Sequence, residues 1–314
     1  MSLVLFRRSP SEPIRVSPAP KKTRPRIGLA LGAGVARGWA HIGAVRELVD
    51  LGIVPDVVVG ASIGAVVGGC FAGGRLDALE EFARSLTRRS VFGLIDVSLR
   101  GGGLMGGDRL RQRLETALGQ QRIENLPTRF VAVATEMRSG HEVWLKSGPV
   151  CDALRASYAL PGIFEPVKLG GRWLFDGAIV NPVPVNVARA FGAEYVLAIS
   201  IGGDTPSGAA VFETEGDEPP ASAPSAWPRW LGGGGGDSAP GVASVMVHTF
   251  NITQDRIMRS RLAGDPPDHT IGIRAKNFGL FEFHRAAELI DLGRAAVRKA
   301  APEIFEHLEA ASAG

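Results

Sequence analysis

Short apolar runs alternate along the chain with segments of helical spacing, and this alternation predicts strands followed by helices. An apolar run at 26–31 passes through a glycine-rich turn into a helix that we expect to reach Leu51, and Pro55 precedes a second apolar run at 57. A strand, a helix and a second strand in this order indicate a parallel pair in an α/β sheet. The same patterns predict further strands at 130–134, 142–145, 195–199 and 270–273, a hairpin at 170–171 into a strand that ends at Asp176, and helices at 76–87, 108–118, 150–158, 185–191, 242–262 and 283–300.

The stretch 57–74 carries no charged side chain, and its length is compatible with two structures. It reaches the lower limit for a transmembrane helix, and Gly60, Gly64 and Gly68 have the spacing of a helix-dimer face. It also changes at Gly60 from a β-branched run to small residues, which is typical of a buried strand followed by a closely packed helix. The many glycines and this change of pattern favour the strand and helix.

Composition limits the class of protein and suggests how the chain is divided. The 314 residues are 45% apolar and 21% charged, which is typical of a globular protein with a substantial core. A net charge of +3 does not indicate a nucleic-acid-binding protein. The two cysteines, Cys70 and Cys151, lie in apolar helical patterns, so we expect reduced core residues and not a disulfide.

Two segments differ in composition from the rest of the chain. Residues 1–25 combine cations with prolines, which predicts a disordered basic arm that either contacts anionic lipid head groups or remains a solvated tail. No apolar region of a secretory signal follows its first arginines, so we expect a cytoplasmic protein, with peripheral contact at the inner face of the membrane as an option. Residues 203–241 are rich in Gly, Pro and Ser and predict a disordered insertion. These segments flank a core at 26–202 and a C-terminal helical part at 242–314 that we expect to pack on it.

A candidate nucleophile lies where the second apolar run ends. Gly60, Ser62 and Gly64 form a G-x-S-x-G motif, in which a serine occupies a strained turn between a strand and a helix. Glycines on both sides allow the crowded backbone, and the helix N-terminus favours negative charge on the serine oxygen. Because the chain has 41 glycines, the motif alone is weak evidence, and its position between strand and helix patterns carries more weight.

The glycine loop after the first strand fits neither of two common nucleotide motifs. A dinucleotide loop requires glycine at the position of Arg37, and no Gly-Lys-Ser/Thr follows for a phosphate loop. If the two strand–helix units are adjacent, the loop lies beside Ser62, and its N–H groups can stabilise an oxyanion. The alternative is a glycine turn without a catalytic part. Arg37, next to Gly38, would either bind a substrate phosphate or hold the loop in place, and we favour the second role. The candidate oxyanion donors are Gly32, Ala33, Gly34 and Val35.

A serine hydroxyl needs a base, and the sequence offers both imidazoles and a carboxylate. The order Ser62, Asp176 and then a histidine satisfies a hydrolase triad, but no histidine lies in a recognisable turn after a strand. Asp176 ends an aromatic strand and precedes Gly177, and apolar neighbours would raise its pKa towards that of a useful base. The alternative for this pair is an ordinary Asp-Gly turn. His41 is expected to pack or hydrogen-bond, and the histidines that satisfy the triad order are His248, His269 and His284.

Taken together, these segments resemble the patatin-like phospholipase family, especially its bacterial and neuropathy-target-esterase-like branch. The resemblance covers roughly 26–200. It rests on the loop 32–38, which is similar to G-x-G-x-x-R/K-G, on the G-x-S-x-G of 60–64, on the proline block 159–164, and on the D-G-A at 176–178. It implies a three-layer α/β/α fold with a mainly parallel sheet and a Ser62–Asp176 dyad without histidine. It also implies no metal or cofactor, and hydrolysis of fatty acyl esters.

Three functions remain open at this level. The first is a serine acylhydrolase that acts on phospholipids or lysophospholipids through an acyl-enzyme, with transient contact to a membrane surface. The second is an acyltransferase or thioesterase that uses the same dyad. The third is a regulatory binding module that keeps the fold with little turnover. Head group, chain length and oligomeric state are not determined by these patterns.

Overall fold

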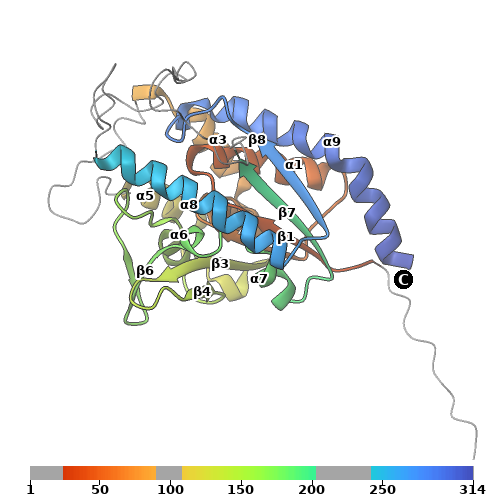
Figure 1. Ribbon diagram of the computed structural model, residues 1–314, viewed down its shortest axis with the longest axis horizontal. Helices are drawn as coiled ribbons and strands as arrows, with labels where there is room; N and C mark the ends of the chain where they lie inside the picture. The colour runs from red at the N-terminus through yellow and green to blue at the C-terminus, as the bar shows by residue number, and fades with distance from the viewer. Residues whose placement is uncertain (1–23, 90–107, 203–241, 314) are drawn as a thin grey trace, which may run out of the picture.

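The structure is a computed structural model that describes residues 24–89, 108–202 and 242–313 (Figure 1). The predicted insertion at 203–241, the glycine cluster at 101–107 and nearly all of the predicted basic arm lie outside these residues. The described residues form one mixed sheet with helices packed on both faces. The predicted α/β class is therefore confirmed.

The described part of the sheet has eight strands in the order β5-β6-β3-β2-β1-β7-β8, with β4 paired to β3 outside this path. The strands β3, β2, β1, β7 and β8 run parallel to one another, whereas β4, β5 and β6 are antiparallel to their partners. Their bounds are β1 Ile27–Leu31, β2 Val57–Ala61, β3 Arg129–Glu136, β4 Glu142–Leu145, β5 Val167–Leu169, β6 Arg172–Asp176, β7 Tyr195–Gly202 and β8 His269–Arg274.

The central strands are apolar throughout because helices cover both of their faces. In β1, Leu29 and Leu31 pack into one core with α1, α2, α6 and α9, and Ala30 between them packs into a second core with α7 and α8. Figure 1 shows α9 and α8 on opposite sides of strands β7 and β8. The helices are α1 Ala40–Asp50, α2 Ile63–Ala72, α3 Leu76–Ser85, α5 Asp108–Leu118, α6 Val150–Tyr158, α7 Val185–Ala190, α8 Val242–Gly264 and α9 Ala286–Ala313, with short 3-10 turns η1 Val35–Trp39, η2 Ile123–Asn125, η3 Gly177–Ile179 and η5 Phe283–Arg285.

One prediction about the helices is confirmed and another is corrected. The uncharged stretch 57–74 forms strand β2 and helix α2, and in the part of the chain that the structure describes no helix has the length and apolar character to cross a membrane. The last helix does not end at residue 300. Although Pro302 removes one backbone donor, α9 continues to Ala313, because Ala301 and Ile304 on its buried face remain packed in the core.

The arrangement of strands around β3 positions the candidate site. Strand β2 pairs with residues up to Val133 and β6 pairs from Ala134 onward, while β4 pairs with 132–135 and so occupies the opposite edge. The carboxyl ends of β2 and β6 therefore meet end to end along one edge of β3. Ala61 is opposite Val133 and Asp176 is opposite Ala134, and adjacent positions on a strand are only about 3.3 Å apart.

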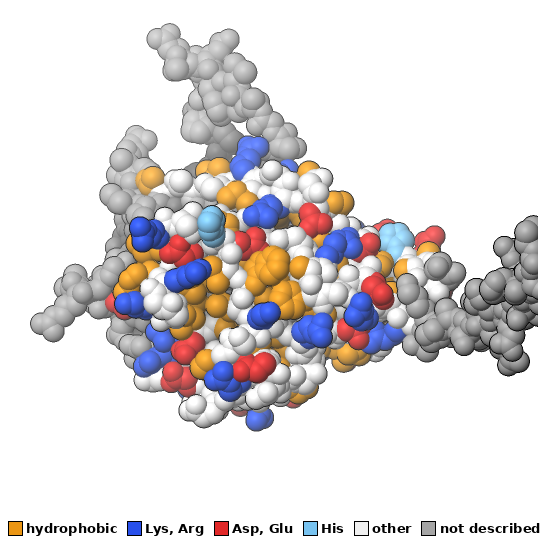
Figure 2. All heavy atoms as spheres, turned by 90° about the horizontal axis from the view of Figure 1, so that it is seen from below, with side chains coloured by type: hydrophobic (Ala, Val, Ile, Leu, Met, Phe, Trp, Pro, Cys, Tyr) orange, Lys and Arg blue, Asp and Glu red, His pale blue; other side chains and the backbone are white. Residues whose placement is uncertain are grey.

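The surface mixes charges of both signs with scattered apolar side chains. On the face drawn in Figure 2, Lys and Arg side chains alternate with Asp and Glu around small apolar groups. Large exposed apolar residues include Trp144 and Trp173, on the antiparallel strands β4 and β6. The face drawn in Figure 2 therefore has no large patch of charge of a single sign.

Candidate active site

Ser62 lies at the bend between β2 and α2 in a backbone conformation that is unusual for a residue with a side chain. Its φ is 57° and its ψ is −128°. Among the described residues only Ser62 and Val35 combine a positive φ with a side chain, and both belong to the predicted site. Such conformations are held by their surroundings and occur preferentially at functional positions. The strained turn is the one expected of a nucleophile between a strand and a helix.

The two glycines of the motif are required by close backbone contacts. A Cβ on Gly60 would lie 2.4 Å from the nitrogen of Ala65, and a Cβ on Gly64 would lie 2.3 Å from the carbonyl oxygen of Leu31. Since real Cβ atoms do not approach backbone atoms this closely, only glycine allows α2 to start so near β1 and β2. The sequence of the turn therefore fixes where the hydroxyl of Ser62 points.

The hydroxyl of Ser62 donates a hydrogen bond to Asp176. The distance from Ser62 Oγ to Asp176 Oδ2 is 2.7 Å, and the other carboxylate oxygen accepts from the backbone N–H of Ala178 at 2.8 Å. Ser62 is 8% exposed and Asp176 is 1% exposed. The next residue, Gly177, lies so close to β3 that a Cβ would be 2.1 Å from the carbonyl oxygen of Val133. The Asp-Gly pair therefore forms a turn and also brings the backbone of Gly177 into close contact with β3.

Burial changes the acid–base properties of Asp176. Loss of solvation raises its pKa to about 7, while the hydrogen bonds from Ser62 and Ala178 oppose the shift. A carboxylate with a pKa near neutrality is a better proton acceptor than an ordinary one. Neither of the hydrogen bonds to its carboxylate comes from an imidazole. Of the histidines in triad order, His284 bonds to Arg88 and His269 contacts the ring of His307.

The glycine loop after β1 rests directly on the start of α2. A Cβ on Gly38 would lie 2.0 Å from a methyl carbon of Ile63, the residue that follows Ser62. The N–H of Gly32 donates to Ile199 at 3.0 Å, and the N–H of Ala33 donates to Pro182 at the same distance. Both groups belong to the sheet and its connections, so they cannot also bind an oxyanion.

The candidate donor set is therefore smaller than expected. Of the four residues predicted, Gly34 and Val35 keep N–H groups for which the described residues provide no acceptor. The positive φ of Val35, 51°, marks the point where the loop turns into η1. We correct the predicted set to Gly34 and Val35, because the N–H groups of the first two residues are used by the fold.

A C-terminal segment holds the far side of this loop. Arg37 Nε donates to the carbonyl of Phe278 at 2.7 Å, and the N–H of Ala36 donates to the carbonyl of Leu280 at 3.1 Å. Burial lowers the pKa of the Arg37 guanidinium, and the nearby Glu282 carboxylate opposes this shift. These contacts are the ones expected of an arginine that fixes the loop.

Three buried polar side chains outside the predicted set bond to the backbone of the site. His41 Nε2 donates to the carbonyl of Gly32 at 2.7 Å, and burial lowers the His41 pKa to about 4, so the ring is neutral. Thr135 donates to the carbonyl of Asp176 at 2.9 Å, and Ser157 accepts from the N–H of Ser62 at 3.1 Å. The sequence does contain a signal for Ser157, because this hydroxyl occupies the buried face of α6 at helical spacing from apolar residues.

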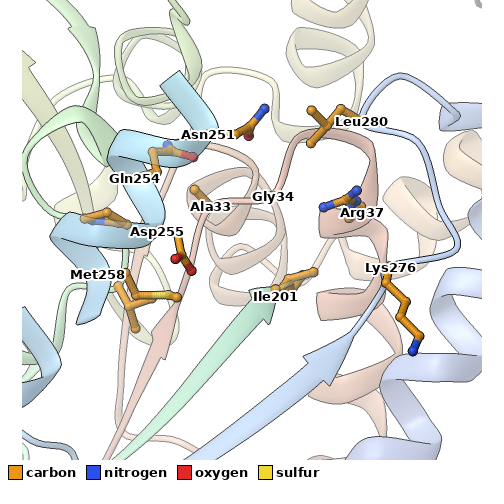
Figure 3. A pocket seen from close by; sticks show the side chains of 13 residues that line it. Ala33, Gly34, Arg37, Ile201, Asn251, Gln254, Asp255, Met258, Lys276 and Leu280 are labelled. Carbon is orange, nitrogen blue, oxygen red and sulfur yellow. The ribbon is translucent and has the colours of Figure 1, made fainter. Parts of the chain in front are cut away.

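A pocket of about 350 Å³ lies beside the loop, beyond the carboxyl ends of β1 and β7 (Figure 3). Ala33 and Gly34 line it from the loop after β1 and Ile201 lines it from β7, while α8 closes the opposite side with side chains such as Met258. Since β2 and β7 flank β1 on either side, this is the switch point where α/β sheets commonly bind ligands. The dyad does not line the pocket, but Gly34 borders it. In Figure 3 the Arg37 guanidinium also lies on its wall.

The structure, within its described residues, has no group of three or more His, Cys, Asp or Glu side chains arranged to hold a metal ion. Cys70 and Cys151 are both buried free thiols, as the sequence predicted. The groups that the structure brings together at Ser62 are a hydroxyl and a buried carboxylate.

Comparison with known proteins bears on the family of this chain. The model of the patatin-like phospholipase family matches residues 29–189. An uncharacterized NTE family protein of Mycobacterium tuberculosis is 33% identical over 92% of this chain and 96% of its own length. The lysophospholipase NTE1 of Yarrowia lipolytica is 30% identical over 72% of this chain, which corresponds to 16% of that protein.

Solved structures are more distant. VipD from Legionella pneumophila aligns with a TM-score of 0.44 and 15% identity, over 60% of this chain and 51% of that one, which is too remote to support an argument. The family model covers more than half of the chain, and the mycobacterial relative matches almost from end to end. The chain therefore belongs to the patatin-like phospholipase family.

Proposed function

We propose that this protein is a serine acylhydrolase that cleaves fatty acyl esters of phospholipids or lysophospholipids, with Ser62 as the nucleophile and Asp176 as the base. The observation that supports it most directly is the 2.7 Å hydrogen bond from Ser62 Oγ to Asp176 Oδ2. Three features add to it: the backbone conformation of Ser62, the raised pKa of Asp176 and the family of the chain.

In the proposed reaction the ionised Asp176 accepts the hydroxyl proton as Ser62 Oγ attacks the ester carbonyl carbon. The carbonyl oxygen becomes an oxyanion, which the N–H groups of Gly34 and Val35 would meet. One donor of this kind contributes about 3–4 kcal/mol to stabilisation of the transition state. The leaving alkoxide takes the proton from Asp176, and an acyl-Ser62 ester remains. Water then attacks this ester, again with Asp176 as the base, and releases the fatty acid.

The pocket at the ends of β1 and β7 would receive the polar part of the substrate. It borders Gly34, so a group bound there is adjacent to the proposed oxyanion donors. Arg37 uses Nε to hold the loop, and the described residues supply no acceptor for its two terminal nitrogens. Those nitrogens would be available to a phosphate oxygen. In this way the two roles considered for Arg37 are compatible.

Contact with a membrane surface would bring the substrate to the site. The basic residues of the N-terminal arm, which lie outside the described part of the chain, would supply the attraction to anionic lipid. Co-sedimentation with anionic and with neutral vesicles, compared between the full chain and a chain that starts at residue 24, tests this part. Equal binding by both chains would contradict it.

The dyad is tested by Ser62→Ala and Asp176→Asn. Each should lower ester turnover by about three orders of magnitude or more, because groups that act as a unit are lost together. Turnover of phospholipid, lysophospholipid and p-nitrophenyl ester panels is the measurement, and covalent labelling of Ser62 by a fluorophosphonate is the second readout. Turnover near the wild-type level in either variant would disprove the dyad. Product analysis with an added lysolipid or alcohol acceptor separates hydrolysis from acyl transfer.

A further inference from the structure

Ser157, on α6, is fully buried and connects the candidate nucleophile to the central strand beside it. Its Oγ accepts a hydrogen bond from the N–H of Ser62 at 3.1 Å and donates one to the carbonyl oxygen of Val133 at 2.6 Å. Its relative exposure is 0%. This hydroxyl therefore both accepts and donates a hydrogen bond. Both bonds lie where β2 ends.

The N–H of Ser62 needs such a partner because the sheet ladder stops one residue earlier. The parallel pairing of β2 with β3 ends at Ala61 opposite Val133, and the backbone then turns into the positive φ of Ser62. The hydroxyl of Ser157 is inserted between the N–H of Ser62 and the carbonyl of Val133. It thereby replaces a direct hydrogen bond between two strands by a bridge through a side chain.

Val133 also lies next to the residue that positions the carboxylate. Asp176 pairs with Ala134, the next residue of β3, and Gly177 packs against the carbonyl of Val133. Through Ser157, the backbone of Ser62 is therefore bound to the same short segment of β3 that pairs with Asp176. The 2.7 Å separation between Ser62 Oγ and Asp176 Oδ2 depends on both strand ends being held against that piece.

We propose that Ser157 is a positioning residue, which holds the strained backbone of Ser62 so that its hydroxyl stays aimed at Asp176. The inference rests on the proposed function and adds a residue that touches neither substrate nor reacting atoms. Ser157 is not a second nucleophile, since its proton is donated to Val133 and solvent does not reach it. Thr135 provides a similar contact on the other side, from its hydroxyl to the carbonyl of Asp176.

Ser157→Ala removes both hydrogen bonds of the bridge and keeps the Cβ atom in place. We expect kcat for a p-nitrophenyl acyl ester to fall at least tenfold while KM stays within twofold, because ester binding does not involve this hydroxyl. The rate of fluorophosphonate labelling of Ser62 should fall by a similar factor, since it reports the nucleophile without turnover.

Ala156→Gly is the matched control, because it weakens the same helix at a neighbouring buried position without touching the bridge. It should lower the melting temperature and leave kcat per folded molecule within twofold. Ser157→Cys keeps a side chain of similar size with only a weak donor and acceptor, and it decides the question if the alanine variant does not fold. Its labelling rate should fall at least fivefold.

Two results separate this inference from the proposed function. If Ser62→Ala abolishes turnover but Ser157→Ala and Ser157→Cys label at the wild-type rate, the positioning role is wrong and the proposed function stands. If Ser62→Ala retains turnover, the proposed function fails first. An equal fall in kcat per folded molecule in Ala156→Gly and in Ser157→Ala would also overturn the inference. The fall would then result from weakening of the helix and not from loss of the two hydrogen bonds of Ser157.

Discussion

At the scale of the residue, the feature on which the proposed mechanism depends is a carboxylate that is almost out of contact with solvent. Asp176 is 1% exposed and keeps two hydrogen-bond donors, the hydroxyl of Ser62 and the N–H of Ala178. Two donors are fewer than a carboxylate finds in water, so the neutral form is favoured and the pKa rises. In the proposed mechanism, the burial that raises this pKa makes Asp176 a base suited to neutral pH.

The pH dependence of hydrolysis follows from this shift. Because the pKa of Asp176 is raised to about 7, the ionised form that can accept a proton is lost as the pH falls through that value. We expect kcat/KM to rise with pH and to level off above neutrality, with a value about tenfold below the plateau at pH 6. The measurement is kcat/KM for a neutral ester between pH 5 and 9, corrected for spontaneous hydrolysis. A flat profile across this range would be incompatible with Asp176 as the base.

At the scale of the element, the site depends on which strands share an edge of β3. The short motifs predicted the bend at Ser62 and offered Asp176 as a candidate base, and the family resemblance implied that the two are partners. The sequence did not predict that β6 runs antiparallel to β3 and meets β2 end to end. Contacts between distant residues, such as the hydrogen bond that joins Ser62 and Asp176 across 114 positions, leave no trace in local periodicity. The sequence also assigned oxyanion roles to Gly32 and Ala33, whose N–H groups are bonded to distant carbonyls that only the fold reveals.

The contact between η1 and the C-terminal segment gives a prediction about Arg37. Arg37→Gln removes the charge and the bond from Nε to the Phe278 carbonyl, so the loop that carries Gly34 should lose its support. If holding the loop is its main role, kcat falls about tenfold for a phospholipid and for an uncharged p-nitrophenyl ester alike. If phosphate binding dominates, KM rises for the phospholipid and the uncharged ester is hardly affected. Wild-type kinetics on both substrates would contradict both roles.

At the scale of the whole molecule, the part of the chain after the family match completes the core. The matched residues end at 189, yet β7 pairs with every residue of β1, and α9 packs along α1. Two arginines of α9, Arg294 and Arg298, bond to the nearly buried Glu47 of α1. The hydrophobic pattern predicted these late elements individually, but their positions beside the first strand and helix required the structure.

Deletion of α9 should therefore prevent folding. A chain that ends at residue 285 loses four large apolar side chains that are fully buried, Leu289, Ile290, Val297 and Ile304. At about 1.5–3 kcal/mol each, this amounts to about 6–12 kcal/mol, which is comparable to the whole stability of a typical domain. We expect no cooperative thermal transition by circular dichroism and no labelling of Ser62. The control ends at residue 309 and keeps all four side chains, so it should melt like the full chain. Cooperative melting of the shorter chain would contradict this account.

The end-to-end meeting of β2 and β6 also has a consequence for a chain that is still being synthesised. A ribosome-bound fragment that ends before residue 172 contains the nucleophile but has no strand to bring a base to it, and β3 still has an open edge beyond Val133. In the proposed mechanism, ester cleavage therefore begins only after β6 has been synthesised and has closed this edge of the sheet.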